Sequence, residues 1–559
     1  MTSTFSRPTS VPTSVPTSVK EGLCAGALLL IFAILAIGSL QRMTLTADEE
    51  SHYGYGWKLL HFDASRGADN SKMAFSALNA LPRRIVELLA PGILGGRLET
   101  VEFGRYVTVV CALFLAWLVY RWARALYGPA AGLLALTLYV FEPNILAHAG
   151  LVTTDLYATW MTALAVWSFW RLLSHEGPGA WRVATVGAVV FAVAQLAKYT
   201  SAHLVPILIL IAAGHAAPAL WRLARAGQWR DLAGRIVTAG KYAALYAAWF
   251  LVIVNAAYWG QGTFTAFRDY GLRSTQFQAV RSALGPLAGL PVPVPEPYLE
   301  GLDRVMETER SGSNNVYLLG EGGKGGIPGR RFPEYYAVAW LYKEPIATQV
   351  LLLFALVAYV LRFRRFDFRR NEWPIAATVL FFACYFTFVF QTQKGIRFVL
   401  VVLPLLFVFT GSLLRDATTM SRRSLVLIGA LLAYLAVSTL SYYPHFIPYF
   451  NELLWDRKQA YRILVDSNLD WGQSGRYVER YLRAHPDASL EPDRPRSGTM
   501  LVSANKLAGL LLGEQFRWLR ENFEPVGHVA YSHLLFRVTP EALQRVIDPL
   551  PPDHGDKVN

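Results

Sequence analysis

The chain has 559 residues, of which 53% are hydrophobic and only 17% are charged, and its mean hydropathy is +0.29. This composition is typical of membrane proteins with several spans and argues against a water-soluble fold. The formal net charge of +13 comes from short Lys and Arg clusters between apolar runs. Such clusters are typical of the cytoplasmic loops of membrane proteins, so the positive charge does not indicate a nucleic-acid partner. All three cysteines lie inside apolar runs, so neither a disulfide framework nor a thiolate metal site is expected.

The N-terminal region combines a polar tail with a long apolar run. Residues 1–20 repeat Pro-Thr-Ser-Val, and this composition predicts a disordered cytoplasmic tail. Residues 22–40 form an uninterrupted apolar run, long enough to cross a hydrocarbon core of about 30 Å. No small-residue cleavage site follows it, so we interpret the run as a retained helix and not as a signal peptide.

A cluster of ionisable residues follows this first span, where Asp48, Glu49, Glu50 and His52 lie within five positions. A carboxylate at the membrane surface can take a proton from an acceptor hydroxyl or amine. Asp48 is therefore the leading candidate for a general base, with Glu49 as the alternative. Alternatively, acidic residues after a membrane span have no catalytic role and only lie where the chain enters water. Asp48 and His52 are four residues apart and would share a helix face, but no third metal ligand is evident, so a divalent metal is not favoured and no cofactor is predicted.

Further apolar segments predict an all-α polytopic membrane protein of about eleven crossings. The later segments cover about residues 103–120, 130–141, 156–170, 183–213 as a hairpin, 242–259, 346–361, 374–390, 398–414 and 425–442. Placing the tail inside makes the arginine-rich loops cytoplasmic. Residues 21–443 then form the transmembrane domain, with outer-face loops at 42–102 and 260–344. Helices along the membrane surface are expected within 58–102.

The last part of the chain, residues 444–559, loses the long apolar runs. Strand-like pieces at 499–503 and 533–538 lie around helical pieces at 477–483 and 516–522. We expect a small soluble α/β domain on the outer face.

Other polar residues are predicted to share this outer face. Asp155 opens an apolar helix and follows Asn144 and His148; it either lines an acceptor or donor cleft or serves only as a helix cap. Lys198 lies within an apolar stretch, where an unpaired ammonium is costly and often functional. Lys394 and Arg397 open another span. Lys198, Lys394 and Arg397 either bind a lipid phosphate or snorkel to the interface. The site residues predicted from the sequence are therefore Asp48, Glu49, His52, Asn144, His148, Asp155, Lys198, Lys394 and Arg397.

Four stretches resemble glycosyltransferase family 39, the protein O-mannosyltransferase-like enzymes of the GT-C superfamily. They are the acidic stretch 48–49, the segment 143–156, the Tyr-Pro-His block 443–452 and the block 466–473 with Asp-Ser-Asn-Leu-Asp-Trp-Gly-Gln. Glu50 departs from the family, which often has proline after Asp-Glu. The resemblance implies a GT-C fold and an inverting, hexosyl or mannosyl-type transfer from a polyprenyl-phosphate sugar to an acceptor protein, lipid or glycan. It places the active site at the outer face of a bacterial inner membrane, with Asp48 as the base and Asp155 in the cleft.

A transporter or lipid flippase is the alternative interpretation. Such proteins carry ionisable groups deep in several spans and often have repeated halves. This chain shows no internal repeat and, apart from Lys198, places its charges at the ends of apolar segments. This pattern favours the transferase.

Overall fold

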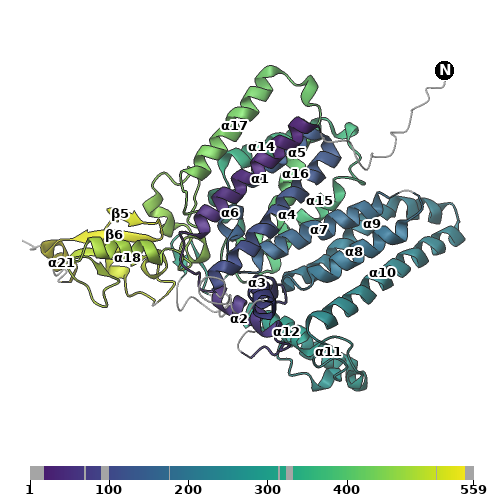
Figure 1. Cartoon of the computed structure of the whole chain (residues 1–559), viewed down its shortest axis with the longest axis horizontal. Coiled ribbons are helices and arrows are strands. Elements are labelled where there is room, and N and C mark those ends of the chain that lie inside the picture. Colours follow the sequence, from purple (N-terminus) through teal and green to yellow (C-terminus); the bar gives the residue numbers. More distant parts are fainter. Residues whose placement is uncertain are drawn as a thin grey trace, which may run out of the picture.

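The computed structural model (Figure 1) describes residues 18–67, 71–89, 100–175, 177–311, 315–322, 331–511 and 513–547. A bundle of long helices forms most of the molecule, and a small sheet lies beyond one end of it. The mainly helical fold predicted from the sequence is confirmed. Residues 1–17, most of the predicted tail, lie outside the described residues.

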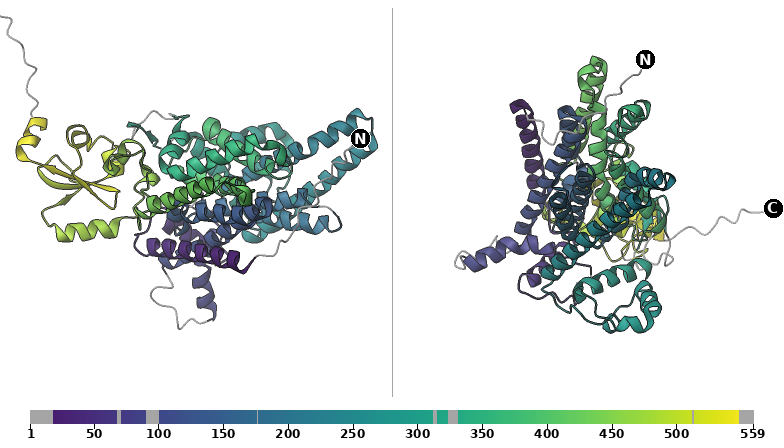
Figure 2. Two further views of the ribbon diagram at one scale, coloured as in Figure 1. Left: turned by 90° about the horizontal axis from the view of Figure 1, so that it is seen from above. Right: turned by 90° about the vertical axis from the view of Figure 1, so that its right-hand side faces the viewer.

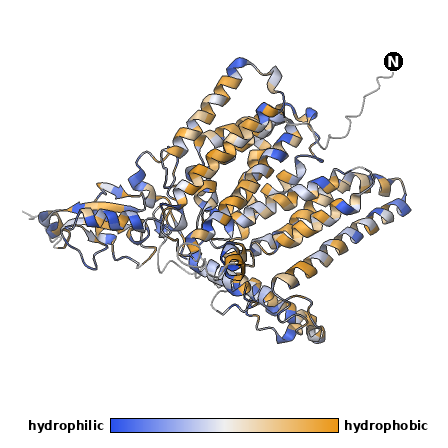
Figure 3. Ribbon diagram, viewed as in Figure 1, coloured by the Kyte–Doolittle hydropathy of each residue, from blue (hydrophilic) through white to orange (hydrophobic). Residues whose placement is uncertain are grey.

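Every apolar segment predicted from the sequence is helical, because each is rich in Leu, Ala, Val and Phe and carries few helix breakers in its interior. The helices are α1 Val19–Leu40, α4 Val101–Tyr127, α5 Pro129–Val140, α7 Asp155–Leu173, α8 Ala180–Ala194, α9 Leu204–Arg225, α10 Trp229–Ala257, α14 Ile346–Leu361, α15 Trp373–Cys384, α16 Leu403–Thr410 and α17 Arg422–Leu440. Short helices η3 Tyr199–His203, η8 Ile396–Val402 and η9 Gly411–Leu414 extend α9 and α16. The hydrophobic colouring of Figure 3 follows these helices.

Six helical segments among the described residues are long and apolar enough to cross a membrane, and up to eight spans result if each of two bent pairs counts as one. One pair is α5 with α6 (Pro143–Ala149), bent by 65°, and the other is α13 (Tyr335–Lys343) with α14, bent by 108°. Two shorter apolar helices, Ala180–Ala194 and Trp373–Val389, add to these. Length and composition thus give fewer complete spans than the predicted eleven, because several segments are short or broken.

Polar contacts distinguish the two ends of the bundle. At the end where α1 begins, Arg124 of α4 pairs with Glu21 of α1 at 2.5 Å and Arg365 pairs with Asp416 at 3.2 Å; we call this the arginine end. At the opposite end, which we call the site end, the backbone N–H of Thr44 donates to the carbonyl of Gln473 at 3.0 Å. The arginine-rich loops lie away from the C-terminal sheet, as the predicted topology requires.

Two helices follow the first span at the site end, α2 (Glu49–Leu59) and the amphipathic α3 (Ser76–Leu89). They pack closely because residue 56 is glycine: a Cβ there would lie 2.2 Å from the carbonyl oxygen of Ser76. Figure 2 shows α3 projecting away from the bundle, and Ile85 and Leu88 on it are 45% and 64% exposed. An exposed apolar face beside Arg83 and Arg84 suits a helix lying in the membrane interface.

The polar loop after α10 folds into its own short elements, of which helices α11 and α12 lie below the bundle in Figure 1. They are η4 Phe267–Asp269, α11 Thr275–Leu284, η5 Gly285–Gly289, α12 Glu296–Ser311, β1 Tyr317–Leu318 and β2 Glu321–Gly322. Asp303 of α12 holds the start of α11, since its carboxylate accepts from the backbone N–H groups of Arg273 and Ser274 at 2.7 and 2.8 Å.

The C-terminal unit is a small α/β fold, with strand order β3-β4-β6-β5. The elements are α18 Gly475–Ala484, β3 Ser489–Leu490, β4 Gly498–Ser503, α19 Ala504–Leu507, α20 Arg517–Asn522, β5 Gly527–Val529, β6 His533–Val538 and α21 Pro540–Ile547. The central strands β4 and β6 are antiparallel; buried Leu534 and Phe536 alternate with more exposed residues along β6, whereas residues 500–503 of β4 are all buried. The predicted strands and helices are confirmed.

Residues 444–473 connect this unit to the bundle through buried polar contacts. Asn451 donates from Nδ2 to the carbonyl oxygens of Leu341 and Glu344 at 2.6 and 2.7 Å. Asn505 of α19 donates to the carbonyl of Asp470 at 2.7 Å. The helical part and the sheet are therefore joined by a packed segment next to the site end.

Candidate active site

Four polar side chains from distant parts of the chain meet at the site end. Asp48 is the N-cap of α2, Asp155 is the first residue of α7, Lys198 lies between α8 and η3, and Arg397 lies in η8. Lys198 Nζ donates to Asp155 Oδ1 at 2.5 Å, and Arg397 Nη1 donates to Asp48 Oδ2 at 3.3 Å. Arg397 Nη1 also lies 3.8 Å from Asp155 Oδ2, so the four residues form one charge cluster.

Aromatic rings hold the two cations of this cluster. The Arg397 guanidinium lies 4.5 Å from the ring centre of Trp471 and 5.3 Å from that of Phe398, while Lys198 Nζ lies 4.5 Å from the Phe398 ring. Cation–π contacts of this kind fix a cation without neutralising it. The rings thus fix the positions of both cations, whose charges are balanced by Asp48 and Asp155.

Solvent reaches the members of the cluster unequally. The Asp48 side chain is 37% exposed, whereas that of Asp155 is 3% exposed and that of Arg397 is 14% exposed. Asp155 does not cap α7: the N-cap is Thr154, which makes no side-chain cap bond. Asp155 instead fixes the two cations, and Asp48 presents a carboxylate to incoming molecules.

The charges around Asp48 keep it ionised. Burial alone would raise the pKa of Asp48, but the positive charges of Arg397 and Lys72 outweigh burial and lower the pKa below its usual range. Asp48 is therefore a carboxylate at neutral pH, the form that a general base requires.

His52 is buried next to this cluster and is neutral at physiological pH. Burial and the positive charge of Lys72 together lower the pKa of His52 to about 3, against the opposing negative charges of Asp48 and Asp155. Its Nδ1 lies 3.4 Å from the hydroxyl of Ser76. A neutral imidazole can orient a polar substrate group but supplies no positive charge.

Lys394 lies beside the cluster. Its carbonyl accepts a hydrogen bond from Ser467 Oγ, and its ammonium acts on Asp466: burial raises the pKa of Asp466, while the charges of Arg397 and Lys394 oppose this. Of the three predicted phosphate-binding cations, the structure brings Lys198 and Arg397 together on Asp155 and places Lys394 near Asp466.

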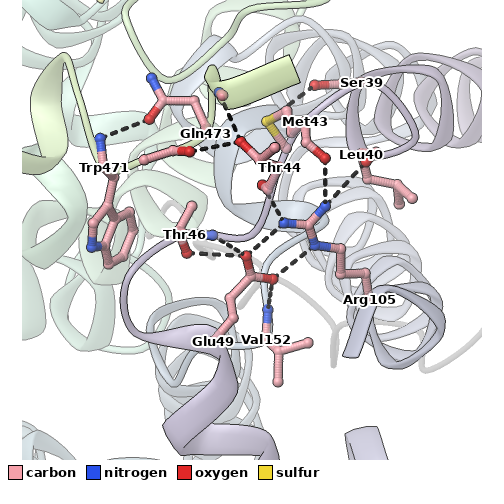
Figure 4. A network of polar contacts seen from close by, with 12 residues as sticks. Ser39, Leu40, Met43, Thr44, Thr46, Glu49, Arg105, Val152, Trp471 and Gln473 are labelled. Carbon is pink, nitrogen blue, oxygen red and sulfur yellow. Dashed lines mark hydrogen bonds and ion pairs between the residues drawn. The ribbon is translucent and has the colours of Figure 1, made fainter. Parts of the chain in front are cut away.

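Glu49 points toward Arg105 of α4 (Figure 4). Both of its carboxylate oxygens accept from Arg105 of α4, at 2.8 Å from Nε and 2.6 Å from Nη2, and the side chains of both residues are 0% exposed. The backbone N–H groups of Thr46 and Val152 also donate to Glu49, at 2.7 and 3.0 Å. Glu49 is thus fully occupied as an anchor between α2, α4 and the segment before α7.

Asn144 and His148 lie on the short helix α6. Asn144 Nδ2 donates to Glu142 Oε1 at 2.7 Å and to the carbonyl of Lys343 at 2.8 Å, so Asn144 connects the two bent helix pairs and not the charge cluster. His148 Nδ1 donates to the carbonyl of Asn144 at 2.8 Å, and its ring centre lies 6.1 Å from that of Trp471. His148 therefore packs behind the aromatic wall of the site.

A buried lysine that the sequence analysis did not single out supports this wall. Lys343 is 1% exposed, and its Nζ donates to the carbonyls of Ile447 and Asn468 at 2.8 and 2.7 Å. Asn468 Oδ1 in turn accepts from the backbone N–H of Ile396 at 2.9 Å. Lys343 thus links the end of α13 to the residue that precedes Arg397.

Two signals in the sequence could have identified these supporting residues. Arg105 lies inside a predicted apolar span, where a charged residue requires a partner. Lys343 and Glu344 likewise adjoin an apolar segment. Among the described residues, no three His, Cys, Asp or Glu side chains are grouped so that they could hold a metal ion.

Comparison with known proteins supports the resemblance. Residues 98–227, which include Arg105, Asp155 and Lys198, match the family model described as dolichyl-phosphate-mannose-protein mannosyltransferase. This match confirms the resemblance to mannosyltransferases of the GT-C type over that segment. No curated protein sequence matches the chain.

Three solved structures are similar to the chain at 13% identity. The archaeal oligosaccharyltransferase AglB from Archaeoglobus fulgidus, in complex with an inhibitory peptide and a dolichol-phosphate, has a TM-score of 0.44; the similarity covers 83% of this chain and 60% of AglB. ArnT from Cupriavidus metallidurans in the apo state has a TM-score of 0.28, with 94% and 99% of the two chains covered. ArnT bound to undecaprenyl phosphate also has a TM-score of 0.28, with 93% and 98% covered.

Proposed function

We propose that the chain is a membrane-embedded, inverting glycosyltransferase that moves a sugar, of hexosyl or mannosyl type, from a polyprenyl phosphate to an acceptor protein, lipid or glycan. The reaction takes place at the site end, which we assign to the outer face of a bacterial inner membrane. The observation that carries this proposal is the cluster of two carboxylates and two cations around Arg397. The cluster brings a carboxylate that can serve as a base within ion-pair distance of a cation that can bind a phosphate.

In the proposed reaction, the acceptor oxygen or nitrogen attacks the anomeric carbon of the sugar from the side opposite the phosphate. Asp48 takes the proton of the acceptor as the new bond forms. The bond between the anomeric carbon and the phosphate oxygen breaks, and the polyprenyl phosphate leaves with the electron pair. Arg397 and Lys198 stabilise the negative charge that the leaving phosphate gains, which is the larger electrostatic contribution to such a transfer.

Donor binding would also activate the base. In the structure, Arg397 donates to Asp48 at 3.3 Å and lowers the pKa of its carboxyl. A phosphate that binds Arg397 draws part of this positive charge away, so the pKa of Asp48 rises and the carboxylate becomes a better proton acceptor. Arg397 therefore has two roles: it binds the donor phosphate, and it lets the basicity of Asp48 rise only once the donor is bound.

An apolar cavity near Lys198 supports a lipid-linked donor. The cavity has a volume of about 520 Å³ and lies between α2, α7, α8 and the end of α10, with Leu196, Trp160 and Trp259 among its lining residues. The backbone N–H of Phe75, another lining residue, donates to the carbonyl of Leu196 at 3.1 Å. An isoprenoid chain has the apolar surface that such a cavity buries favourably.

The test is to identify the lipids that co-purify with the protein in mild detergent by mass spectrometry. Asp48→Asn should retain polyprenyl-phosphate sugar, because the amide spares binding but removes the base, whereas wild type should carry bare polyprenyl phosphate. Lys198→Met with Arg397→Met should carry neither. A carrier lipid that is the same on wild type and on Asp48→Asn would favour the transporter or flippase, which needs no base at this position.

A further inference from the structure

A second cavity lies at the arginine end, between α7 and α8, far along both helices from Asp155 and Lys198. It has a volume of about 170 Å³ and is lined by Trp167, Ser168 and Arg171 of α7 and by Arg182, Val183 and Val186 of α8. Its walls are almost wholly apolar, and Val186 is 61% exposed on the surface of the bundle. The cavity therefore opens toward the bilayer and has two arginines at its rim.

The two arginines at this rim have no acidic partner within the part of the chain that the structure describes. The Arg171 guanidinium lies 5.1 Å from the ring centre of Trp167, a contact that orients the cation without pairing its charge. Arg182 lies in the first turn of α8, whose N-cap is Gly179 and makes no side-chain cap bond. Two guanidinium groups and the positive end of a helix dipole thus surround the mouth of an apolar cavity.

We infer that this groove binds an anionic phospholipid of the leaflet at the arginine end. The headgroup phosphate lies between Arg171 and Arg182, and an acyl chain follows Trp167, Val183 and Val186 into the cavity. Charge complementarity selects the anionic headgroup, since basic pockets between membrane helices attract acidic lipids. The apolar walls select a lipid over a soluble anion, because a free phosphate gains nothing from burying them. The inference is independent of the transferase activity proposed for the site end.

The position of the groove gives such a lipid a structural role. The α7–α8 pair connects the arginine end to the charge cluster, because α7 begins at Asp155 and α8 ends shortly before Lys198. A lipid seated between the two helices adds contacts to both of them. We expect it to stabilise the pair that carries half of the charge cluster.

The experiment compares wild type with Arg171→Ala/Arg182→Ala by native mass spectrometry, with dioleoyl phosphatidylglycerol as the probe and dioleoyl phosphatidylcholine as the neutral lipid. The matched control is Arg222→Ala/Arg225→Ala, since Arg225 lies 4.8 Å from the ring of Trp221 at the end of α9, outside the groove. Each arginine near an anionic headgroup contributes about fivefold to binding, so the groove variant should bind phosphatidylglycerol about thirtyfold more weakly while the control keeps the wild-type affinity.

Two further arms make the test decisive. Val183→Trp fills the cavity but keeps both charges, and it should also lose phosphatidylglycerol. Inorganic phosphate at the same concentration should not raise the melting temperature of the wild type, whereas phosphatidylglycerol should raise it. The inference would be overturned if the groove variant and the control lost phosphatidylglycerol binding equally. It would also be overturned if wild type bound both lipids equally, or if Val183→Trp bound phosphatidylglycerol like wild type. Retained melting temperatures in the absence of lipid show that the variants are folded.

Discussion

At the scale of single residues, the neighbours of two adjacent carboxylates separate their roles. Asp48 and Glu49 are consecutive, but Asp48 is partly exposed and shares Arg397 with Asp155, whereas Glu49 is fully buried on Arg105. A base must reach its substrate and exchange its proton, which a buried carboxylate that already accepts five hydrogen bonds cannot do. In the proposed reaction Asp48 is therefore the base, and Glu49 has an anchoring role.

The electrostatic link between Arg397 and Asp48 predicts a shift in the pH dependence of the reaction. Because Arg397 helps to lower the pKa of Asp48, the ionised base persists to low pH, and activity is lost only as the pH falls through this lowered pKa. Arg397→Gln removes the nearby charge, so the acidic limb of kcat/KM should move to higher pH by about one pH unit or more.

The measurement is the pH profile of kcat/KM for Arg397→Gln, with Arg476→Gln as the control, since Arg476 is exposed and bonds only the carbonyl of Gln41 among the described residues. The control should keep the wild-type profile. His52→Asn should leave the profile unchanged between about pH 5 and 8, because His52 is already neutral there. An acidic limb that does not move in Arg397→Gln would show that Arg397 does not tune the base.

At the scale of elements, buried ion pairs hold the helices that carry the site. Arg105 reaches from α4 to Glu49 at the start of α2 and also donates to the backbone carbonyls of Leu40 and Thr44 at 3.1 and 2.8 Å. These bonds fix the turn between α1 and α2 (Figure 4), and with it the position of Asp48. Lys343 likewise fixes the segment before Arg397, because its Nζ donates to the carbonyl of Asn468.

Glu49→Gln should destabilise the fold much more than Asp48→Asn. The amide leaves the Arg105 guanidinium buried without a counter-charge, which costs about 3–5 kcal/mol in comparable buried pairs. Asp48 is partly exposed, so its amide should change the free energy of unfolding by less than about 1 kcal/mol. Denaturant unfolding of both variants in detergent measures the difference; equal stabilities would contradict the anchoring role of Glu49.

Lys343→Met tests the second anchor. Its removal leaves the buried carbonyls of Ile447 and Asn468 without their donor, so a loss of about 1–3 kcal/mol for each carbonyl in the free energy of unfolding is expected. Lys58→Met is the control, because Lys58 forms an exposed pair with Asp63 at 3.7 Å and such pairs contribute about 1 kcal/mol or less. A loss no larger than that of the control would exclude the anchoring role.

At the scale of the whole molecule, the proposed function requires the site end and the C-terminal sheet to lie on the outer face of the membrane. Cysteine labelling tests this placement. With the three native cysteines replaced, Arg483→Cys on α18 should react with a membrane-impermeant maleimide in intact spheroplasts, whereas Arg364→Cys at the arginine end should react only after lysis. The reverse pattern would invert the topology and move the charge cluster to the cytoplasm.

The sequence predicted the helices and the small sheet because hydropathy and strand alternation are local signals. It also predicted that Asp48, Asp155, Lys198 and Arg397 share one face, because topology follows from the positions of the apolar runs. It could not separate Asp48 from Glu49, since the partner of Glu49 lies on another helix 56 residues later. It placed Asn144 among the site residues, whereas Asn144 connects the two bent helix pairs, and it did not single out Lys343, because the contact between these two residues joins positions 199 apart in the chain.

The central claim is that Asp48 supports the transfer of sugar from a polyprenyl phosphate. The most direct measurement follows the release of bare polyprenyl phosphate by phosphorus NMR. The donor is the polyprenyl-phosphate sugar extracted from Asp48→Asn. It is incubated with membrane acceptors and with fresh wild type, Asp48→Asn or Glu50→Gln. We predict release with wild type and Glu50→Gln, and a rate about a hundredfold or more lower with Asp48→Asn. Equal release by wild type and Asp48→Asn, or no release by any of the three, would contradict the account.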